Sequence, residues 1–258
     1  MGGLGNQLFI IFSTINESII NNKKFEIYIP PNVNTSLDKI VRTSDYEIKE
    51  ILFKIKDKIT ETKPDHKYNI ILSGYMQKQY GNNFEKICYI TGIRDYQYII
   101  KKKHDYLFND KQINVSIHFR QGDYVTANKI DNRFYLLSYN YYSNCVNKLL
   151  QKFPKINIQF LIFFEKEEDN INNIIFDLKN NYNIKYKVID SSYSTSEQLI
   201  LQSLCNHNII ANSTFSLWSA YLNNNIDKTV FFPPKRGFKN FISICKQLNF
   251  EPVNDEKE

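Results

Sequence analysis

The sequence predicts an α/β protein of the doubly wound type, with mainly parallel strands. Segments with the two-residue alternation of strands and segments with the period of amphipathic helices follow one another along most of the 258 residues. The run Ile158–Phe164 is apolar throughout, which is typical of a parallel strand with both faces buried. A glycine-rich loop near the N-terminus leads directly into a helical pattern. Together these patterns favour sheets covered by helices on both faces.

The first part of the chain begins with the loop Gly2–Gln7 and continues into a helix. Spacings of four, three and four residues place a set of apolar side chains on one helical face, namely Leu8, Phe12, Ile15 and Ile19. We expect a strand at Phe25–Ile29, stopped by the two prolines that follow, and a second strand at Asn69–Leu72. The polar stretch between them, Asn32–Lys67, is expected to form helix and loop.

The rest of the chain alternates regularly between the two patterns. Strands are predicted at Ile113–Phe119, Ile158–Phe164, Lys185–Ile189, Asn208–Ala211 and Thr229–Phe232. Helices are predicted at Tyr141–Phe153, Asp169–Asn180, Glu197–Cys205 and Phe215–Leu222. We expect a turn at Gln121-Gly122-Asp123 and a frayed C-terminus over residues 254–258. A boundary between Lys101 and Lys111 would give an N-terminal lobe of residues 1–108 and a C-terminal lobe of residues 109–258.

The charge balance is mildly basic and shows no pattern of nucleic-acid binding. The net charge of +6 is spread along the chain. The densest run, Lys101-Lys102-Lys103, lacks the interleaved aromatic or glycine residues of nucleic-acid modules, so a solvated helix end is its simplest interpretation. A positive balance would help to attract an anionic small molecule.

The cysteines and the hydropathy pattern indicate a soluble, cytoplasmic protein. The four cysteines are far apart and form no CxxC pair, so we expect buried free thiols and neither disulfides nor a cysteine metal site. No segment is apolar for long enough to span a membrane, and the N-terminus lacks the pattern of a signal peptide.

The N-terminal glycine loop could hold a phosphate group. Gly3 and Gly5 precede a helix, where backbone N–H groups can approach an anion closely and the helix dipole stabilises its charge. Asn6 and Gln7 would add side-chain donors. An ordinary tight turn explains the glycines equally well, so the loop alone does not decide between the two.

A second motif, His118–Tyr124, follows the predicted strand at its carboxyl end, the edge at which parallel α/β sheets bind ligands. His118 and Arg120 would share one face of that strand. A guanidinium at this place could hold a diphosphate through paired hydrogen bonds and offset charge on a departing nucleotide. An ion pair between Arg120 and Asp123 that secures the turn is an equally good interpretation.

A third motif, Asn208–Trp218, carries small polar residues from a buried strand to the start of a helix. Its hydroxyls and free backbone N–H groups could meet a phosphate. Helix capping by Ser213 or Thr214 is expected in any case. Trp218, the single tryptophan, is expected to pack in the core.

These three segments together resemble the α-1,2-fucosyltransferases of glycosyltransferase family 11. Gly2–Phe9 is similar to the family's Gly-Gly-Leu-Gly-Asn-Gln loop, and His118–Tyr124 to its His-x-Arg-Arg-Gly-Asp-Tyr motif. Asn208–Leu222 closely resembles its Asn-Ser-Thr-Phe-Ser-x-Trp segment. Weaker similarities occur in the same order at Gly74–Gln77, Tyr141-Tyr142, Ile162-Phe163 and Pro233–Lys235, so the resemblance covers nearly the whole chain.

The resemblance implies a GT-B-like fold of two Rossmann-like lobes with the donor site in the cleft. It implies inverting transfer of L-fucose from GDP-β-L-fucose to a glycan hydroxyl such as galactose O-2, in an α-1,2 linkage, without a required metal. The sequence agrees in having neither Asp-x-Asp nor Gly-x-Gly-x-x-Gly. No cofactor or nucleic-acid partner is implied, and the acceptor and oligomeric state do not follow from the sequence.

The resemblance also implies roles for individual residues. Arg120 would bind the β-phosphate and stabilise the charge of the leaving group, while Asp123 and His118 are both candidates for the general base. Asn6 would close on the diphosphate from the other lobe. The expected donor-binding residues are Gly3, Gly5, Gln7, Glu197, Asn212, Ser213, Thr214, Phe215 and Ser216.

Several positions depart from the family pattern. Gln121 replaces the second arginine of the motif, so Arg120 would carry more of the phosphate charge and donor affinity would be weaker. Phe164-Glu165-Lys166 replaces a Ser-Asp-Asp, Ile10 stands where glutamine is usual, and Gly237 where tryptophan is usual. In the family a strand precedes the glycine loop, whereas this sequence starts at the loop itself, with Met1-Gly2.

Other functions remain open at this point. The same scaffold could use another GDP-sugar, or it could be a degenerate, non-catalytic protein that binds GDP or a glycan, as Gln121 would allow. A Rossmann oxidoreductase or methyltransferase fits the α/β pattern but lacks the corresponding fingerprint.

Overall fold

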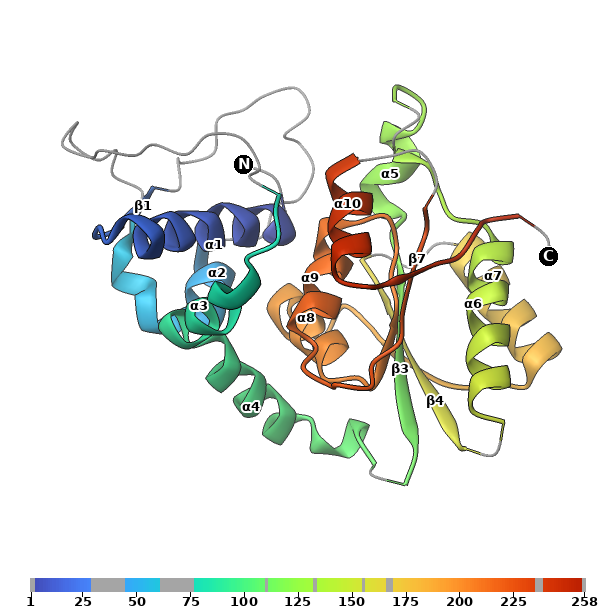
Figure 1. The fold of residues 1–258 in the computed structure, drawn as a ribbon. Coiled ribbons are helices and arrows are strands. Elements are labelled where there is room, and N and C mark those ends of the chain that lie inside the picture. The colour runs from blue at the N-terminus through green and yellow to red at the C-terminus, as the bar shows by residue number, and fades with distance from the viewer. Residues whose placement is uncertain are drawn as a thin grey trace. The chain divides into compact units, whose positions relative to one another are not determined.

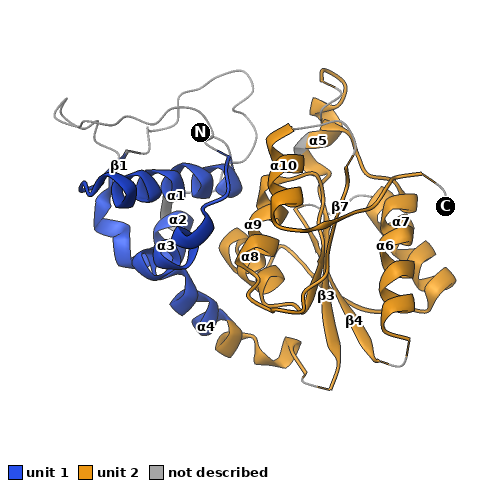
Figure 2. Ribbon diagram, viewed as in Figure 1, with its two compact units in different colours: residues 1–100 blue, residues 101–258 orange. Residues whose placement is uncertain are grey.

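The chain is divided into two compact units, residues 1–100 and residues 101–258 (Figure 2). The structure is a computed structural model. It describes residues 3–28, 45–60, 77–109, 111–131, 134–154, 156–165, 169–234 and 239–256, without the side chains of Tyr28, Asp45, Tyr46 and Asp123. The predicted strand Asn69–Leu72, the similarity at residues 74–76 and the departures at Lys166 and Gly237 lie outside this part of the chain.

The described part of the first unit is mainly helical (Figure 1). Its elements are α1 (Leu4–Asn21), β1 (Ile27–Tyr28), α2 (Asp45–Ile51), the 3-10 helix η1 (Phe53–Lys58), β2 (Ile59–Thr60), the 3-10 helix η2 (Gly81–Asn83), α3 (Phe84–Thr91) and α4 (Ile93–Lys103), whose last residues belong to the second unit. The two strands pair in parallel, with Ile27 opposite Ile59. β2 corrects the expectation of only helix and loop in this stretch, because a pair of residues is too short to show alternation.

α1 confirms the predicted helical face. Leu8, Phe12 and Ile15 are fully buried. The helix ends where Asn22 adopts a left-handed conformation with φ of 49°. The hydroxyl of Tyr80 donates to the Phe9 carbonyl oxygen at 2.9 Å and so attaches the segment before α3 to α1.

The second unit contains a six-stranded, wholly parallel sheet. Its strands are β3 (Ile113–Phe119), β4 (Ile158–Phe164), β5 (Lys185–Ile189), β6 (His207–Ile209), β7 (Val230–Phe232) and β8 (Glu251–Pro252). Their spatial order is β5-β4-β3-β6-β7-β8, with β3 paired to β4 on one side and to β6 on the other. This is the doubly wound order of a Rossmann fold, and its topological switch point lies between β3 and β6. The predicted α/β class with parallel strands is confirmed.

Helices cover both faces of this sheet (Figure 1). The helical elements are the 3-10 helix η3 (Asp105–Leu107), α5 (Gly122–Ala127), α6 (Tyr139–Lys152), α7 (Asp169–Tyr182), α8 (Thr195–Ser203), α9 (Thr214–Leu222) and α10 (Lys239–Gln247). α6 and α7 pack together on one face, while α8 and α10 both contact α9 on the other. Trp218 of α9 is fully buried, as expected.

Two local predictions differ from the structure. The expected turn at Gln121-Gly122-Asp123 is instead the start of α5, with Gln121 in the N-cap position. α10 and β8 were not predicted, because α10 buries only Phe241, Ile244 and Cys245 and β8 is a two-residue strand. The short apolar pattern of each is too weak for a sequence-based assignment.

The four cysteines are buried free thiols, as expected. Burial raises the pKa of the Cys88 thiol to about 12. Within the described ranges, no helix combines the length and the apolar character needed to cross a bilayer.

The C-terminal segment caps α6, which corrects the expectation of fraying for the residues up to 256. The Asp255 carboxylate accepts hydrogen bonds from the Ser138 backbone N–H at 3.1 Å, the Ser138 hydroxyl at 2.5 Å and the Tyr141 N–H at 3.1 Å. The Asn144 side chain donates to the Glu256 carbonyl oxygen at 2.8 Å. A carboxylate at the first turn satisfies free N–H groups and complements the helix dipole.

We therefore expect Asp255→Ala to lower the free energy of unfolding by about 1 kcal/mol, the usual value of an N-terminal helix cap. Urea unfolding would measure the change. Asp177→Ala, which removes an exposed carboxylate from α7, is the control and should stay within about 0.5 kcal/mol of the parent. Equal stability of the two variants would show that Asp255 does not hold the C-terminal segment on α6.

Candidate functional site

The second and third motifs meet at the switch point of the sheet. β3 and β6 are parallel neighbours, with Ile117 opposite Ile209, so the segments that follow them leave the same edge. The Tyr124 hydroxyl donates to the Asn212 carbonyl oxygen at 3.0 Å. The rings of His118 and Phe215 lie 5.4 Å apart between centroids. The structure thus brings together two predicted groups of site residues that are far apart in the sequence.

His118 is a buried, neutral imidazole at this edge. His118 is the second-last residue of β3 and is 5% exposed. Burial, together with the positive charge of Arg120 as a smaller cause, lowers the pKa of His118 to about 3. Nδ1 is buried and has no hydrogen-bond partner among the described residues. Because a buried polar atom without a partner is costly, this nitrogen is suited to accept or donate a hydrogen bond to a ligand.

Arg120 follows β3 directly and has defined partners. Its Nη1 lies 2.5 Å from Oε2 of Glu165, and its guanidinium carbon lies 5.0 Å from the centre of the Tyr124 ring. The sequence suggested either a phosphate or Asp123 as partner of Arg120. The ion pair described here is with Glu165, while the side chain of Asp123 lies outside the described part of the structure.

Glu165 and Tyr124 are site residues that the sequence interpretation did not assign. Phe119 is opposite Phe164 in the parallel β3–β4 ladder, so Arg120 and Glu165 both stand one residue beyond a paired strand end. The position of Glu165 directly after an apolar strand was the available signal. Its pairing with Arg120 depends on which strands are neighbours, and the sequence does not state that.

Gly122 leaves room for this ion pair. A Cβ atom built on Gly122 would lie 2.6 Å from Oε2 of Glu165, closer than real Cβ contacts allow. The backbone also has φ of +30°, which L residues rarely adopt. The glycine of the motif is therefore explained by the carboxylate that packs against it.

The start of α9 presents small polar groups to the same edge. Ser213 is the N-cap, and its hydroxyl oxygen accepts from the Phe215 N–H at 3.3 Å. The Asn212 amide nitrogen donates to the Tyr135 carbonyl oxygen at 2.9 Å. Its Oδ1 is buried and has no partner in the part of the chain that the structure describes. Ser216 is fully buried and its hydroxyl donates to the backbone of the preceding turn, whereas Thr214 is half-buried.

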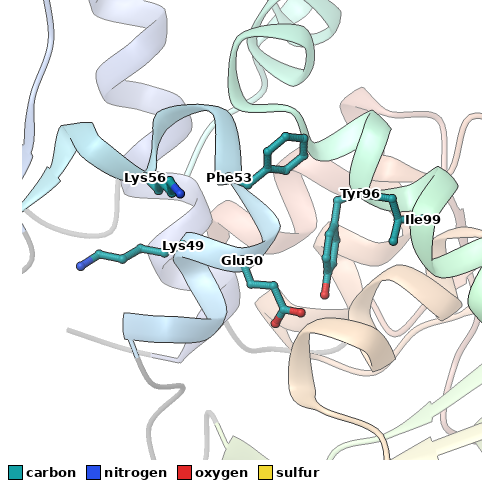
Figure 3. A pocket seen from close by; sticks show the side chains of 6 residues that line it. All are labelled: Lys49, Glu50, Phe53, Lys56, Tyr96 and Ile99. Atoms are coloured by element: carbon teal, nitrogen blue, oxygen red, sulfur yellow. The ribbon is translucent and has the colours of Figure 1, made fainter.

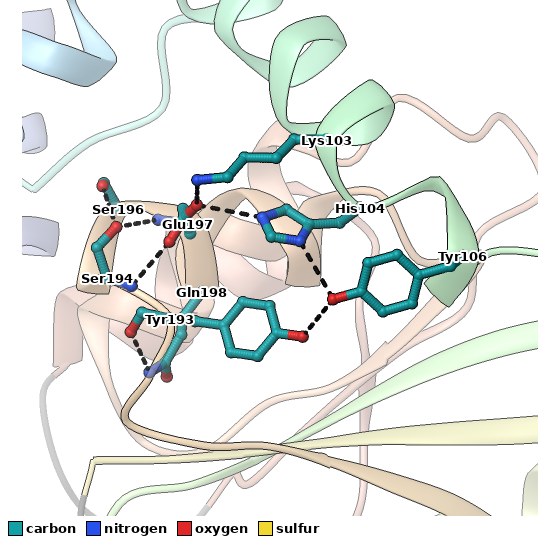
Figure 4. A network of polar contacts seen from close by, with 8 residues as sticks. All are labelled: Lys103, His104, Tyr106, Tyr193, Ser194, Ser196, Glu197 and Gln198. Carbon is teal, nitrogen blue, oxygen red and sulfur yellow. Dashed lines mark hydrogen bonds and ion pairs between the residues drawn. The ribbon is translucent and has the colours of Figure 1, made fainter.

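Glu197 belongs to a different set of contacts (Figure 4). It forms a capping box with Ser194 at the start of α8, in which each side chain bonds the backbone N–H of the other residue. Its Oε1 also lies 2.6 Å from Nζ of Lys103 and 3.1 Å from Nε2 of His104. These contacts attach the end of α4 to α8.

The charge of Glu197 is strongly stabilised. Burial by itself would raise the pKa of Glu197, but hydrogen bonds from Lys103, the Ser194 backbone and His104, with the charge of Lys103, lower it to about 2. Tyr106 and Tyr193 extend this network, with their hydroxyls 2.7 Å apart.

The predicted residues of the glycine loop lie in the first unit, at the start of α1. Gly3 is the exposed N-cap, and a Cβ atom there would meet nothing within 4 Å. Gly5 and Gln7 are buried in the first turns of the helix. Oδ1 of Asn6 accepts from the Gln77 amide at 3.2 Å. The N–H groups of Asn6 and Gln7 both donate to the Gly3 carbonyl oxygen, at 3.0 and 3.2 Å. A ligand role for this loop stays a prediction, and Gly2 lies outside the described residues.

A shallow pocket of about 470 Å³ also lies in the first unit (Figure 3). It is lined by side chains from α2, η1 and α4, namely Lys49, Glu50, Phe53, Lys56, Tyr96 and Ile99. No predicted site residue lines this pocket. The buried polar atoms without partners at the switch point are stronger signs of a ligand site than this open surface.

Comparisons with known proteins agree with the motifs. Residues 26–251 match the family described as "Glycosyl transferase family 11". The chain is 33% identical over 120 residues to the "O-antigen biosynthesis glycosyltransferase WbnK" of Escherichia coli, and the match spans 46% of this chain and 38% of that relative. Among solved structures, "E. coli ADP-heptose lps heptosyltransferase II" is similar over 57% of this chain and 40% of that chain, with a TM-score of 0.38 and 10% identity. A likeness of that size carries no structural argument.

The buried environment of His118 predicts that it stays neutral at moderately acidic pH. The pKa of His118 is lowered from its usual 6.5 to about 3 on folding. The folded state therefore has its full stability above pH 6.5 and loses stability progressively as the pH falls from 6.5 towards 3. In an NMR titration its ring signals, assigned by their loss in His118→Asn, should not shift between pH 7.5 and 4.5. The urea-unfolded chain is the control, and a midpoint near 6.5 in the folded protein would contradict this environment.

The contacts of Glu197 predict a pH-dependent contribution to stability. The pKa of Glu197 is lowered on folding from its usual 4.5 to about 2. The contribution is therefore present above pH 4.5 and is lost as the pH falls towards 2. Glu197→Gln should therefore lower the free energy of unfolding by about 1 kcal/mol at pH 6, with a smaller difference at pH 3. Urea unfolding at the two pH values would measure it, with the half-exposed Glu251→Gln as control. A difference that does not shrink at pH 3 would contradict the role of its charge.

Proposed function

This chain belongs to glycosyl transferase family 11, and we propose that it moves L-fucose from GDP-β-L-fucose to a glycan hydroxyl, with inversion to an α linkage. The family establishes a glycosyltransferase, which has a sugar donor and an acceptor. The observation that carries the proposal is the position of Arg120 directly after β3, at the sheet edge where His118 of β3 lies beside Phe215 at the start of α9. The acceptor position that we favour is galactose O-2. The name of the matched O-antigen biosynthesis relative supports a glycan acceptor.

The donor diphosphate is proposed to bind between Arg120 and the N-terminus of α9. The free N–H groups of the first turn, with the hydroxyls of Ser213 and Thr214, can donate to phosphate oxygens. A guanidinium can hold the same group through charge-assisted hydrogen bonds. The unpartnered Oδ1 of Asn212 and Nδ1 of His118 supply an acceptor and a further polar group for the sugar or the ribose. Phe215, next to His118, would pack against the donor.

In the proposed reaction, the acceptor oxygen attacks C1 of fucose while the bond between C1 and the β-phosphate oxygen breaks. The electron pair of that bond goes to the phosphate, where Arg120 stabilises the growing negative charge. The hydroxyl proton goes to a general base, for which Asp123 and His118 are the candidates. The low pKa of His118 makes it a weak proton acceptor. Both residues stay candidates for the base, and Asp123 is equally suited to a structural role at the start of α5.

Further groups are proposed to complete the donor site. For Asn6, Gly3, Gly5 and Gln7, at the start of α1, a role in donor binding is likewise a proposal, based on the preference of helix N-termini for anions. Glu197 is proposed to act near the nucleoside end. We propose that transfer needs no divalent metal, since Arg120 and the N-terminus of α9 can supply the positive charge that a phosphate requires.

A second candidate function is non-catalytic binding of GDP or a glycan. The observation that favours it is the ion pair in which Glu165 compensates the charge of Arg120, together with the replacement of the second motif arginine by Gln121. Tight binding of GDP without transfer or donor hydrolysis would distinguish this alternative from the enzyme.

We expect the chain to bind GDP and GDP-fucose more tightly than UDP-glucose or NAD, equally well with and without magnesium. Arg120→Ala should weaken GDP binding by at least about tenfold. It should also lower transfer by about a hundredfold or more, as removal of one charge-stabilising donor does in other enzymes. Isothermal calorimetry and product analysis with a galactoside acceptor would measure the two effects.

The matched control is Arg94→Ala. Arg94 also forms a 2.5 Å ion pair with a glutamate, Glu85, and its side chain is 22% exposed against 21% for Arg120. The control should bind GDP like the parent. Full turnover by Arg120→Ala would exclude the proposed mechanism, and preference for another nucleotide sugar would exclude the proposed donor.

A further inference from the structure

The partner of Arg120 lies on one side of β3, and the groups that favour an anion lie on the other. Glu165 follows β4, which pairs with β3 through Phe119 opposite Phe164. Ser213 and the start of α9 follow β6, which pairs with β3 on its opposite side. The ion pair therefore holds the guanidinium on the β4 side of the central strand.

The ion pair is well defined but not deeply buried. Nη1 of Arg120 and Oε2 of Glu165 are 2.5 Å apart, while the two side chains are 21% and 38% exposed. A partly solvated carboxylate can be displaced at a small cost, since such pairs contribute little free energy. Gly122 provides the space in which Oε2 of Glu165 rests. The glycine of the motif thus makes room for the Arg120–Glu165 ion pair, and this pair can still be broken.

A carboxylate and a phosphate make the same demands on a guanidinium. A carboxylate is planar and a phosphate is tetrahedral, but both are anions. The oxygens of both accept charge-assisted hydrogen bonds from the guanidinium N–H groups. The Nη1 hydrogen that points to Oε2 of Glu165, at an Nη1–Oε2 distance of 2.5 Å, cannot be donated to a phosphate oxygen while the pair is intact. The negative charge of Glu165 would also repel a diphosphate nearby. Binding at Arg120 and retention of the ion pair therefore oppose each other.

We propose that Glu165 is an affinity-determining residue that competes with the donor diphosphate for Arg120. In the free protein its carboxylate balances the charge of the guanidinium, and an incoming diphosphate competes with that carboxylate for the charge and the N–H groups of Arg120. Ligands with too little negative charge to displace the carboxylate are thereby disfavoured. This inference rests on the proposed function only in taking the anion to be a diphosphate-linked donor.

The test compares the affinities of the parent, Glu165→Gln and Glu165→Ala for GDP and for inorganic pyrophosphate, by calorimetry on the full chain. Glu165→Gln keeps the size of the side chain, and Glu165→Ala removes every acceptor. Both should bind each ligand roughly two- to fivefold more tightly, the range expected for removal of one partly exposed ion pair. In an Arg120→Ala background the same substitutions should have no effect, because the competition acts through Arg120.

Glu85→Gln is the matched control, since it removes the carboxylate of the similar Arg94–Glu85 ion pair and changes the net charge equally. It should leave both affinities unchanged. Weaker or unchanged binding by both Glu165 variants would overturn the inference, and weaker binding would make Glu165 a residue that positions Arg120. Tighter pyrophosphate binding without any GDP binding would support the competition and exclude the proposed donor. If the parent binds neither GDP nor pyrophosphate, both the proposed competition and the proposed donor are overturned.

Discussion

The parallel pairing of β3 with β4 and with β6 is the constraint on which the site depends. Buried backbone N–H and C=O groups have to be hydrogen-bonded, so a central strand with both neighbours in register is rigid. One face of β3 is apolar, with Val115, Ile117 and Phe119 fully buried. Because all three strands are parallel, the residues that follow them leave the same edge of the sheet. The ion pair of Arg120 with Glu165 and the hydrogen bond of Tyr124 to Asn212 both depend on this arrangement.

Some buried polar side chains of the second unit have hydrogen-bond partners, and others have buried atoms without one among the described residues. Within the sheet, the Asn208 amide donates to the Ser116 hydroxyl at 2.7 Å and accepts at Oδ1 from Asn223 at 2.8 Å. At the carboxyl edge, Nδ1 of His118 and Oδ1 of Asn212 lack partners among the described residues. The first arrangement stabilises packing, whereas unsatisfied buried atoms are tolerated where a ligand supplies the missing bonds. The electrostatics agree with this division, since the same edge holds a neutral histidine beside an arginine whose charge a glutamate balances.

The local conformation of the second unit followed from short-range patterns. The bounds of β3, β4 and β5 agree with those predicted, because alternation and continuous apolar runs report directly on how a strand is buried. The helices deviate by a few residues at their ends, where capping decides the limit. β2, β8 and α10 escaped prediction, since each is short and its packing partners supply most of its stability.

What the sequence by itself determined was the α/β class, most helices and strands of the second unit, and the motifs that place Arg120, His118 and Ser213 at a ligand-binding edge. These features depend on local periodicity and on residue chemistry, both of which can be read from one sequence. Only the tertiary structure decided the strand order, the pairing of Arg120 with Glu165 and the capping of α6 by Asp255. The Arg120–Glu165 and Asp255–Tyr141 contacts join residues 45 and 114 positions apart, and such contacts arise from the cooperative packing of the whole sheet.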